Sequence, residues 1–150
     1  WQIRNIHQLI LKNIDDDNAG RYRQQNVLIS GATSTPPDYT LLNDKMTQLV
    51  DWYNSEAHKL HPIERAAKVH ADFVGIHPFI DGNGRTSRLL MNLELLKSGY
   101  PPCVITVENR LAYYEALDQW MAYGKTEAFI QLVADAVLEG FKPYQVVLRI

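Results

Sequence analysis

The stretch from His77 to Arg88, HPFIDGNGRTSR, constrains the fold of this chain more than any other segment. Pro78 disfavours helical backbone at the residue before it, so one helix is expected to end at His77. Gly82 and Gly84 allow turn conformations that bulkier residues avoid, and the leucines that follow recur at the spacing of an apolar helical face. The sequence therefore predicts a helix, a glycine-rich turn and a second helix in direct succession.

The residue types in this turn suit a polyphosphate. A glycine-rich turn that opens a helix presents free amide groups and the positive end of the helix dipole to an anion. Arg85 and Arg88 lie three residues apart, where they can clamp an anion from one side. Asp81 offers a hard oxygen ligand for magnesium, and His77 offers a base whose unperturbed pKa lies near neutrality. Taken singly, each residue is more simply a cap, a turn former or a solvated charge, but their convergence favours a catalytic site.

These twelve residues match the Fic family motif, HPFx(D/E)GNGRxxR, at every specified position. From about Tyr22 to about Tyr144 the order of elements is also similar to that of Fic domains. The chain thus resembles a protein adenylyltransferase domain of the Fic/Doc superfamily. The resemblance implies transfer of AMP from ATP to a serine, threonine or tyrosine hydroxyl of a target protein, with release of pyrophosphate.

The resemblance also implies a role for each residue of the motif. His77 would accept the proton of the target hydroxyl as the general base, and Asp81 would hold Mg²⁺ between the α- and β-phosphates. The amides of the glycine turn and the side chain of Asn83 would face the phosphates, the two arginines would hold the outer ones, and a tyrosine would line the adenine pocket. The nucleotide-binding residues expected on this basis are Gly82, Asn83, Gly84, Arg85, Arg88 and Tyr114.

Other functions stay open at this point. Gly84 fits the AMP-transferring form, since relatives with lysine at this place act as kinases, but other relatives remove AMP or transfer UMP or phosphocholine. An alternative function of a different class is a non-catalytic module that binds a nucleotide or a protein strand, because a fold can persist after its catalytic activity is lost. The intact His77 argues against that alternative.

Residues 26–39 are expected to form a small β-hairpin flap. Val27 to Ile29 is a short apolar run, and Pro36-Pro37 follows in what reads as a stiff loop. The simpler interpretation is a surface hairpin that caps the bundle. The resemblance instead implies a flap over the active site, which pairs with the backbone of the target protein.

Six helical patterns accompany the flap, so the predicted fold is an all-α, Fic-type bundle. The expected helices span residues 1–14, 40–55, 62–76, 84–98, 107–123 and 127–139, with 141–150 as a packing tail. The expected buried positions include Ile3, Ile6, Ile10 and Ile14 in the first helix, and Leu111, Tyr114, Leu117, Trp120 and Met121 in the fifth. His70 is expected to pack in the core, and His58 with His61 is more simply a helix boundary than a metal site.

Length, composition and net charge limit the class of protein to which this chain can belong. A chain of 150 residues with 46% hydrophobic and 21% charged residues suits a single domain, 1–150. A net charge of −2 gives no reason to expect nucleic acid or a membrane as a partner. The lone Cys103 permits a reducing compartment, and without a signal pattern a cytoplasmic location is expected. The chain begins at Trp1 without an initiator methionine, so we expect it to be a fragment of a longer protein.

Regulation is expected to come from outside these residues. Many Fic proteins carry an inhibitory helix with the pattern (S/T)xxxE(G/N), whose glutamate pairs with the second arginine of the motif. Here Leu138-Glu139-Gly140 ends a predicted helix, but Asp135 stands where serine or threonine is required. An inhibitory helix or an antitoxin chain is therefore an expected partner. Trp1 and Trp52 suit the interface of a homo-oligomer or the core equally well.

Overall fold

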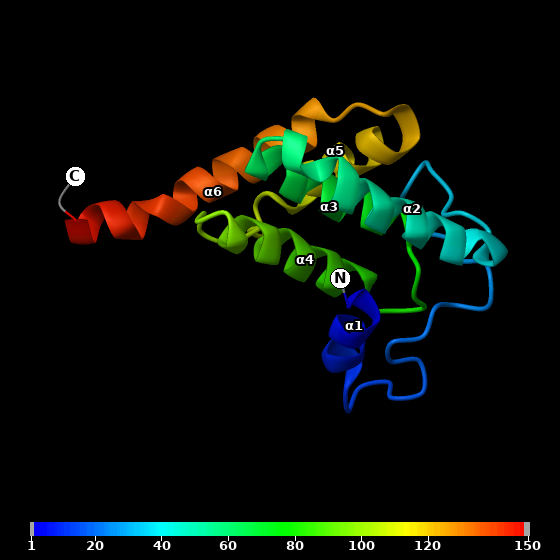
Figure 1. Cartoon of the computed structure of the whole chain (residues 1–150). Coiled ribbons are helices and arrows are strands. Elements are labelled where there is room, and N and C mark those ends of the chain that lie inside the picture. The colour runs from blue at the N-terminus through cyan, green and yellow to red at the C-terminus, as the bar shows by residue number, and fades with distance from the viewer. Residues whose placement is uncertain (1, 149–150) are drawn as a thin grey trace.

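The structure, a computed structural model, describes residues 2–148. Within that range the chain folds into six α-helices and two short 3₁₀ turns, and no residue lies in a strand, so the prediction of a helical bundle is confirmed (Figure 1). The α-helices are α1 (Ile3–Leu11), α2 (Leu42–Ser55), α3 (Pro62–Ile76), α4 (Asn83–Lys97), α5 (Arg110–Tyr123) and α6 (Glu127–Leu148). The 3₁₀ turns are η1 (Tyr39–Leu41) and η2 (Ala57–Lys59).

Helix α3 is the centre of the bundle. It packs most extensively against α4, and α2, α5 and α6 contact it from other sides. Ala66, Ala67 and Ala71 of α3 are fully buried, and their small side chains let Met91 and Phe129 approach the helix closely. The end of α3 and the start of α4 are consequently held by the best-packed part of the molecule, and the motif lies between them.

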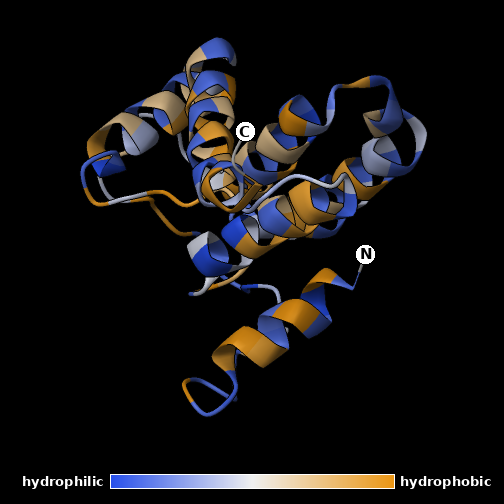
Figure 2. Cartoon of the chain, turned by 90° about the vertical axis from the view of Figure 1, so that its left-hand side faces the viewer, coloured by the Kyte–Doolittle hydropathy of each residue, from blue (hydrophilic) through white to orange (hydrophobic). Residues whose placement is uncertain are grey.

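Helix α1 lies at the edge of the bundle against α4, and its Ile3 belongs to a buried cluster with Met46 and Phe73 (Figure 2). Its buried side chains are Ile3, His7 and Leu11, so the predicted isoleucine face is only partly right. Ile14 is 65% exposed because the helix ends at Leu11, before Asn13 takes a positive φ of 62°. The predicted helix start at Trp1 lies outside the described residues.

Two predictions about the C-terminal half are wrong. Helix α5 begins at Arg110, and its buried face is formed by Tyr113, Ala116, Leu117 and Trp120, so Tyr114 is exposed rather than buried. Helix α6 does not end at Glu139 but continues through Gly140 and Pro143. Gly140 serves close packing rather than capping, because a Cβ there would lie 3.1 Å from the side chain of Pro101.

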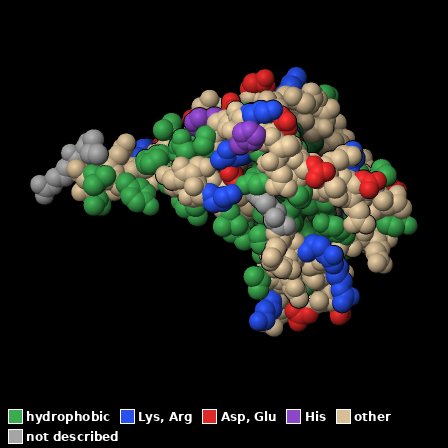
Figure 3. Space-filling view, in the orientation of Figure 1, with side chains coloured by type: hydrophobic (Ala, Val, Ile, Leu, Met, Phe, Trp, Pro, Cys, Tyr) green, Lys and Arg blue, Asp and Glu red, His purple; other side chains and the backbone are tan. Residues whose placement is uncertain are grey.

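The end of α6 projects beyond the bundle (Figure 1). Its last turns expose hydrophobic side chains, which Figure 3 shows on the projecting end. They belong to Tyr144, Val146, Val147 and Leu148. No helix in the described range 2–148 has the length and apolar content that crossing a membrane requires.

The predicted β-hairpin at 26–39 is not found, because this segment is an irregular loop. Side-chain hydrogen bonds close its base instead of a strand ladder. Asn26 accepts a bond from the Tyr39 amide at 2.9 Å and donates one to Asp38 at 2.8 Å. A turn around Gly31, with φ of 79°, forms the tip. We call residues 26–39 the flap loop.

Candidate active site

His77 lies directly after α3 and ends that helix, as predicted. Its backbone is left-handed, with φ of 50° and ψ of 58°, which is uncommon for a residue with a side chain. The ring Nδ1 lies 3.3 Å from the carbonyl oxygen of Val74. A carbonyl only accepts hydrogen bonds, so in the neutral ring Nδ1 carries the proton and Nε2 keeps its lone pair. His77 therefore has the tautomer that a general base at Nε2 requires.

The surroundings keep the His77 ring neutral. Burial lowers its pKa from the ordinary value of 6.5. The hydrogen bond to Val74 and the charge of Asp81 oppose that shift, whereas the charge of Arg23 adds to it. At neutral pH His77 is therefore ready to accept a proton.

Asn83 holds the loop that leads from His77 to α4. Its side-chain oxygen accepts a hydrogen bond from the Phe79 amide at 3.0 Å, and its side-chain nitrogen donates to the Phe79 carbonyl at 2.8 Å. Asn83 is 2% exposed. Both polar atoms of this side chain thus bond within the loop, so Asn83 braces the turn that leads into α4.

His7 is a supporting residue that the sequence does not reveal. It is fully buried, 74 residues before Asp81, whose carbonyl oxygen lies 2.9 Å from His7 Nε2. Its Nδ1 accepts a hydrogen bond from the amide of Gly20 at 2.9 Å. Burial lowers the pKa of His7, which favours the neutral form that these two bonds need. Helix α1 thereby supports the loop between α3 and α4, residues 77–82, which we call the catalytic loop after its predicted role.

The first turn of α4 presents the predicted anion site. Gly82 is its N-cap, with a left-handed φ of 78°, and the amides of the first turn have no acceptor within the helix. Gly84 leaves room for Arg88, since the nearest guanidinium nitrogen lies 3.4 Å from where a Cβ on Gly84 would stand. Arg88 is exposed, and its charge also acts on Tyr113, whose pKa is raised by burial and lowered in part by Arg88.

Asp81 and Arg85 form an ion pair of 2.9 Å beside this turn. The Asp81 side chain is 66% exposed, and its other oxygen accepts a bond from the Gly82 amide at 2.6 Å. No group of three or more His, Cys, Asp or Glu side chains that could hold a metal exists among residues 2–148. One exposed carboxylate next to a phosphate site nevertheless fits Mg²⁺, which commonly takes one or two protein oxygens and completes its shell with phosphate and water.

Tyr114 lies on the exposed side of α5, 52% accessible, with Arg110 near its ring. Its neighbour Tyr113 is buried and bonds to Nε2 of His70 at 2.8 Å. Burial lowers the pKa of His70 to about 3, so His70 is a neutral core residue, as predicted. The exposed ring of Tyr114 is free to stack on a base, whereas Tyr113 is not.

His58 and His61 flank the boundary between η2 and α3. His61 caps α3 by accepting the amide of Ile63 at 3.3 Å, and its other ring nitrogen lies 3.4 Å from the hydroxyl of Tyr100. His58 ends the short turn η2. Both residues mark a helix boundary, as the simpler interpretation predicts.

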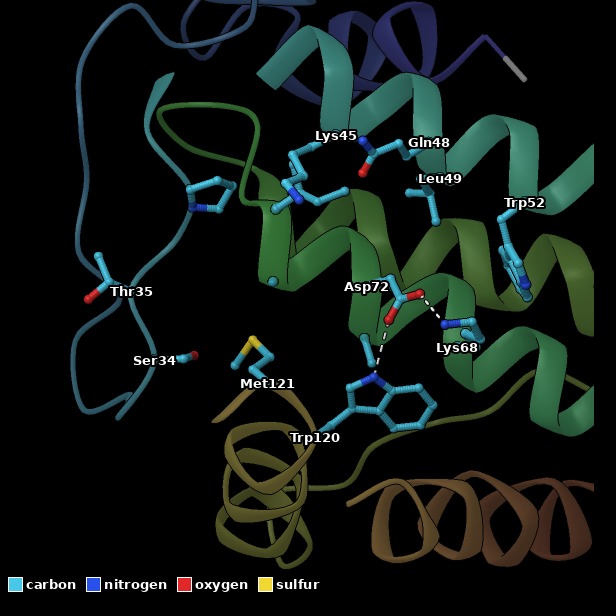
Figure 4. A pocket seen from close by; sticks show the side chains of 14 residues that line it. Ser34, Thr35, Lys45, Gln48, Leu49, Trp52, Lys68, Asp72, Trp120 and Met121 are labelled. Atoms are coloured by element: carbon cyan, nitrogen blue, oxygen red, sulfur yellow. Dashed lines mark hydrogen bonds and ion pairs between the residues drawn. The ribbon is translucent and has the colours of Figure 1, made fainter. Parts of the chain in front are cut away.

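A cavity of about 560 Å³ lies beside the flap loop, and its lining includes Ile76, the residue directly before His77. The flap loop, α2, α3 and α5 line it, and no residue of the motif does (Figure 4). Asp72 pairs with Lys68 at 2.6 Å and accepts a hydrogen bond from the indole of Trp120 at 3.1 Å. Lys45 also reaches the cavity, and no partner for its charge occurs in the described chain. The cavity therefore combines aromatic walls with a free positive charge.

Asp118 of α5 holds the tip of the flap loop. Its two carboxylate oxygens accept hydrogen bonds from the amide and the hydroxyl of Thr33, both at 2.6 Å. These bonds lower the pKa of Asp118, so the carboxylate stays charged. The flap loop is thus tied down at its tip as well as at its base.

Comparison with known proteins identifies relatives of this chain. A family model described as Fic/DOC family matches residues 1–95. The chain is 41% identical over 133 residues to protein adenylyltransferase fic-1 of Caenorhabditis elegans, which covers 88% of this chain and 26% of the relative. It is 41% identical over 134 residues to protein adenylyltransferase Fic of Drosophila willistoni, covering 89% and 26%.

A solved structure shows the same fold. Fic-1 (aa134 - 508) from C. elegans aligns with a TM-score of 0.85 at 37% identity, covering 98% of this chain and 44% of that one. The chain spans about a quarter of the length of the curated relatives it matches.

Proposed function

This chain is a member of the Fic/DOC family, and on that premise we propose that it transfers AMP from ATP to a hydroxyl group of a target protein. One observation carries the proposal. The imidazole of His77, with its Nε2 lone pair free, lies in the short loop between α3 and the N-terminus of α4, where Arg85 and Arg88 project. This neighbourhood of an imidazole and two arginines supports the proposal of a base next to a phosphate site.

The chemistry follows from these groups. His77 Nε2 takes the proton of the target hydroxyl as the hydroxyl oxygen attacks the α-phosphorus, and the bond to the β-phosphate breaks with release of pyrophosphate. Proton transfer of this kind contributes a factor of about 10²–10⁴. Magnesium bound at Asp81 would neutralise charge on the phosphates. Asp81 would hold the ion with its exposed carboxylate, and the ion would compete with Arg85, which now pairs with that carboxylate at 2.9 Å.

The remaining groups of the site hold the nucleotide. The first-turn amides of α4, from Gly82 to Gly84, would face the phosphates, and Arg88 would hold the outermost one. Tyr114 would stack on the adenine with its exposed ring. The side chain of Asn83 would act indirectly, since its bonds to the Phe79 backbone fix the loop between α3 and α4.

The target protein would bind along the flap loop. An extended segment would pair with the flap backbone, and a neighbouring side chain would enter the cavity that the flap loop helps to line. An acidic side chain suits the unpaired charge of Lys45, whereas Lys68 is neutralised by Asp72. An inhibitory glutamate supplied from outside the chain would compete for Arg88, which is exposed. A homo-oligomer and a cytoplasmic location stay predictions.

Labelled ATP tests the proposal. The 150-residue chain is incubated with Mg²⁺, a cell lysate and ATP labelled on the α-phosphate. Labelled protein bands that disappear with His77→Ala are expected. Absence of label from the wild-type chain, with ATP bound normally, would support the non-catalytic alternative. Label transferred from the γ-phosphate instead would identify a kinase and overturn AMP transfer.

A further inference from the structure

Arg23 is a buried cation that joins three parts of the active site. Its residue is 3% exposed, although arginine is almost never fully buried without a paired acid. We propose that Arg23 is a positioning residue for AMP transfer, which fixes the flap loop and the catalytic loop at one separation and thereby sets the target hydroxyl against His77. This inference rests on the proposed function.

The contacts of Arg23 span both loops. Its backbone amide donates to the Pro78 carbonyl at 2.9 Å, and its Nε donates to the His77 carbonyl at 2.9 Å. Its two terminal nitrogens donate to the carbonyl of Gln25 at 2.9 Å and to that of Pro37 at 2.6 Å. One guanidinium therefore ties the catalytic loop to the entry and the exit of the flap loop.

The chemistry of these contacts requires arginine. All three side-chain acceptors are backbone carbonyls, and they lie on different sides of a planar group that offers five donors in a fixed fork. Lysine would keep the charge but has a single flexible nitrogen, which cannot reach all three. Burial lowers the pKa of Arg23, and the charge of Asp38 opposes that shift.

Arg23 also stabilises the backbone conformation of His77. His77 is left-handed, a conformation that costs a side-chain-bearing residue free energy and must be held by its surroundings. The Arg23 Nε bond to the His77 carbonyl supplies such a hold. Without it, the His77 ring and the flap loop would be free to shift independently of each other.

The nucleotide site has separate supports. Asn83 braces Phe79, and His7 bonds to the Asp81 carbonyl, and neither contact involves Arg23. Loss of the three hydrogen bonds of the Arg23 guanidinium should therefore lower the rate of AMP transfer far more than the affinity for ATP. A misplacement of about 1 Å can cost on the order of 10²-fold in rate.

The experiment compares Arg23→Lys and Arg23→Gln with Arg21→Lys and Arg21→Gln in the 150-residue chain. Arg21 is exposed two residues away, so it controls for charge and side-chain size. ATP affinity, thermal unfolding and the initial rate of α-label incorporation into lysate protein are measured. Both Arg23 variants should lower the maximal rate about 10- to 100-fold, with the KM for ATP within about threefold, while the Arg21 variants match wild type.

Two further readouts separate positioning from folding. NMR titration of the His77 ring should give a higher pKa in Arg23→Gln, because the nearby charge is lost. Added methylguanidinium should restore part of the rate in Arg23→Ala. Transfer at the wild-type rate in Arg23→Lys would overturn the proposal, as would unfolding of every Arg23 variant. If the wild-type chain transfers no AMP, the proposed function fails. If the wild-type chain transfers AMP and the Arg23 variants weaken ATP binding as much as they lower the rate, the positioning role is refuted.

Discussion

The imidazole of His7 lies flat against the ring of Phe79, with centroids 3.5 Å apart and an angle of 2° between the planes. His7 belongs to α1, whereas Phe79 lies in the catalytic loop. The stack and the bond from His7 to the Asp81 carbonyl place α1 directly beneath the turn that opens α4. The anion site is therefore built on a surface that a distant part of the chain supplies.

Gly82→Ala should damage this turn beyond the backbone effect alone. A Cβ at Gly82 would lie 3.0 Å from His7 Nε2, in addition to the strain of a φ of 78°. Gly99→Ala is the matched control, because Gly99 has a φ of 80° and nothing within 4 Å of its Cβ position. We expect Gly99→Ala to cost about 1 kcal/mol and Gly82→Ala at least about 2 kcal/mol, with weaker ATP binding only for the latter. Equal losses in denaturant unfolding would contradict the contact with His7.

The rate of transfer should fall only in acid. The pKa of His77 lies below 6.5 in the folded chain, so the base is neutral above that pH and becomes protonated as the pH falls through its lowered value. A profile of kcat/KM against pH should show an acid limb with its midpoint below pH 6.5 and reach a plateau at higher pH. An acid limb with its midpoint at or above pH 6.5 would show that His77 is not the group described.

Acid should also destabilise the fold through His70. Its folded pKa of about 3 lies below the unfolded value near 6.5, so the unfolded chain binds the extra proton between these limits. The stabilisation is complete above pH 6.5 and is lost as the pH falls towards 3, at about 1.4 kcal/mol per pH unit for one group. Urea unfolding of His70→Gln should show a shallower dependence on pH, while the exposed His58→Gln should follow wild type.

Lys45→Glu tests the cavity as a docking site for the target. Reversing this charge should raise the KM for an acidic target roughly fivefold and leave the KM for ATP unchanged, since Lys45 lies outside the motif. Lys12→Glu provides the control, because Lys12 is exposed just after α1 and carries the same change in net charge. The same KM for the target protein in both variants would show that the cavity does not take part in target binding.

Sequence reasoning succeeded where the physics is local. The end of α3 at His77 follows from Pro78, and the glycine turn predicts a helix start at residue 84, one residue from the observed start at Asn83, because backbone restrictions act between neighbours. The flap loop shows the limit of such reasoning. Val27 to Ile29 has strand-like composition, yet no strand forms there, because the loop is closed by side chains such as Asn26 instead of by a paired strand.

The sequence by itself determined which groups are proposed for the chemistry, since His77, Asp81, the glycines and the arginines lie within twelve consecutive residues. Only the tertiary structure decided what holds them. His7 and Arg23 are polar residues in ordinary surroundings of the sequence, and each bonds to a backbone carbonyl of the motif more than fifty residues away. Every residue carries such a carbonyl, so no pattern of side chains in the sequence indicates which carbonyl a distant donor will bind.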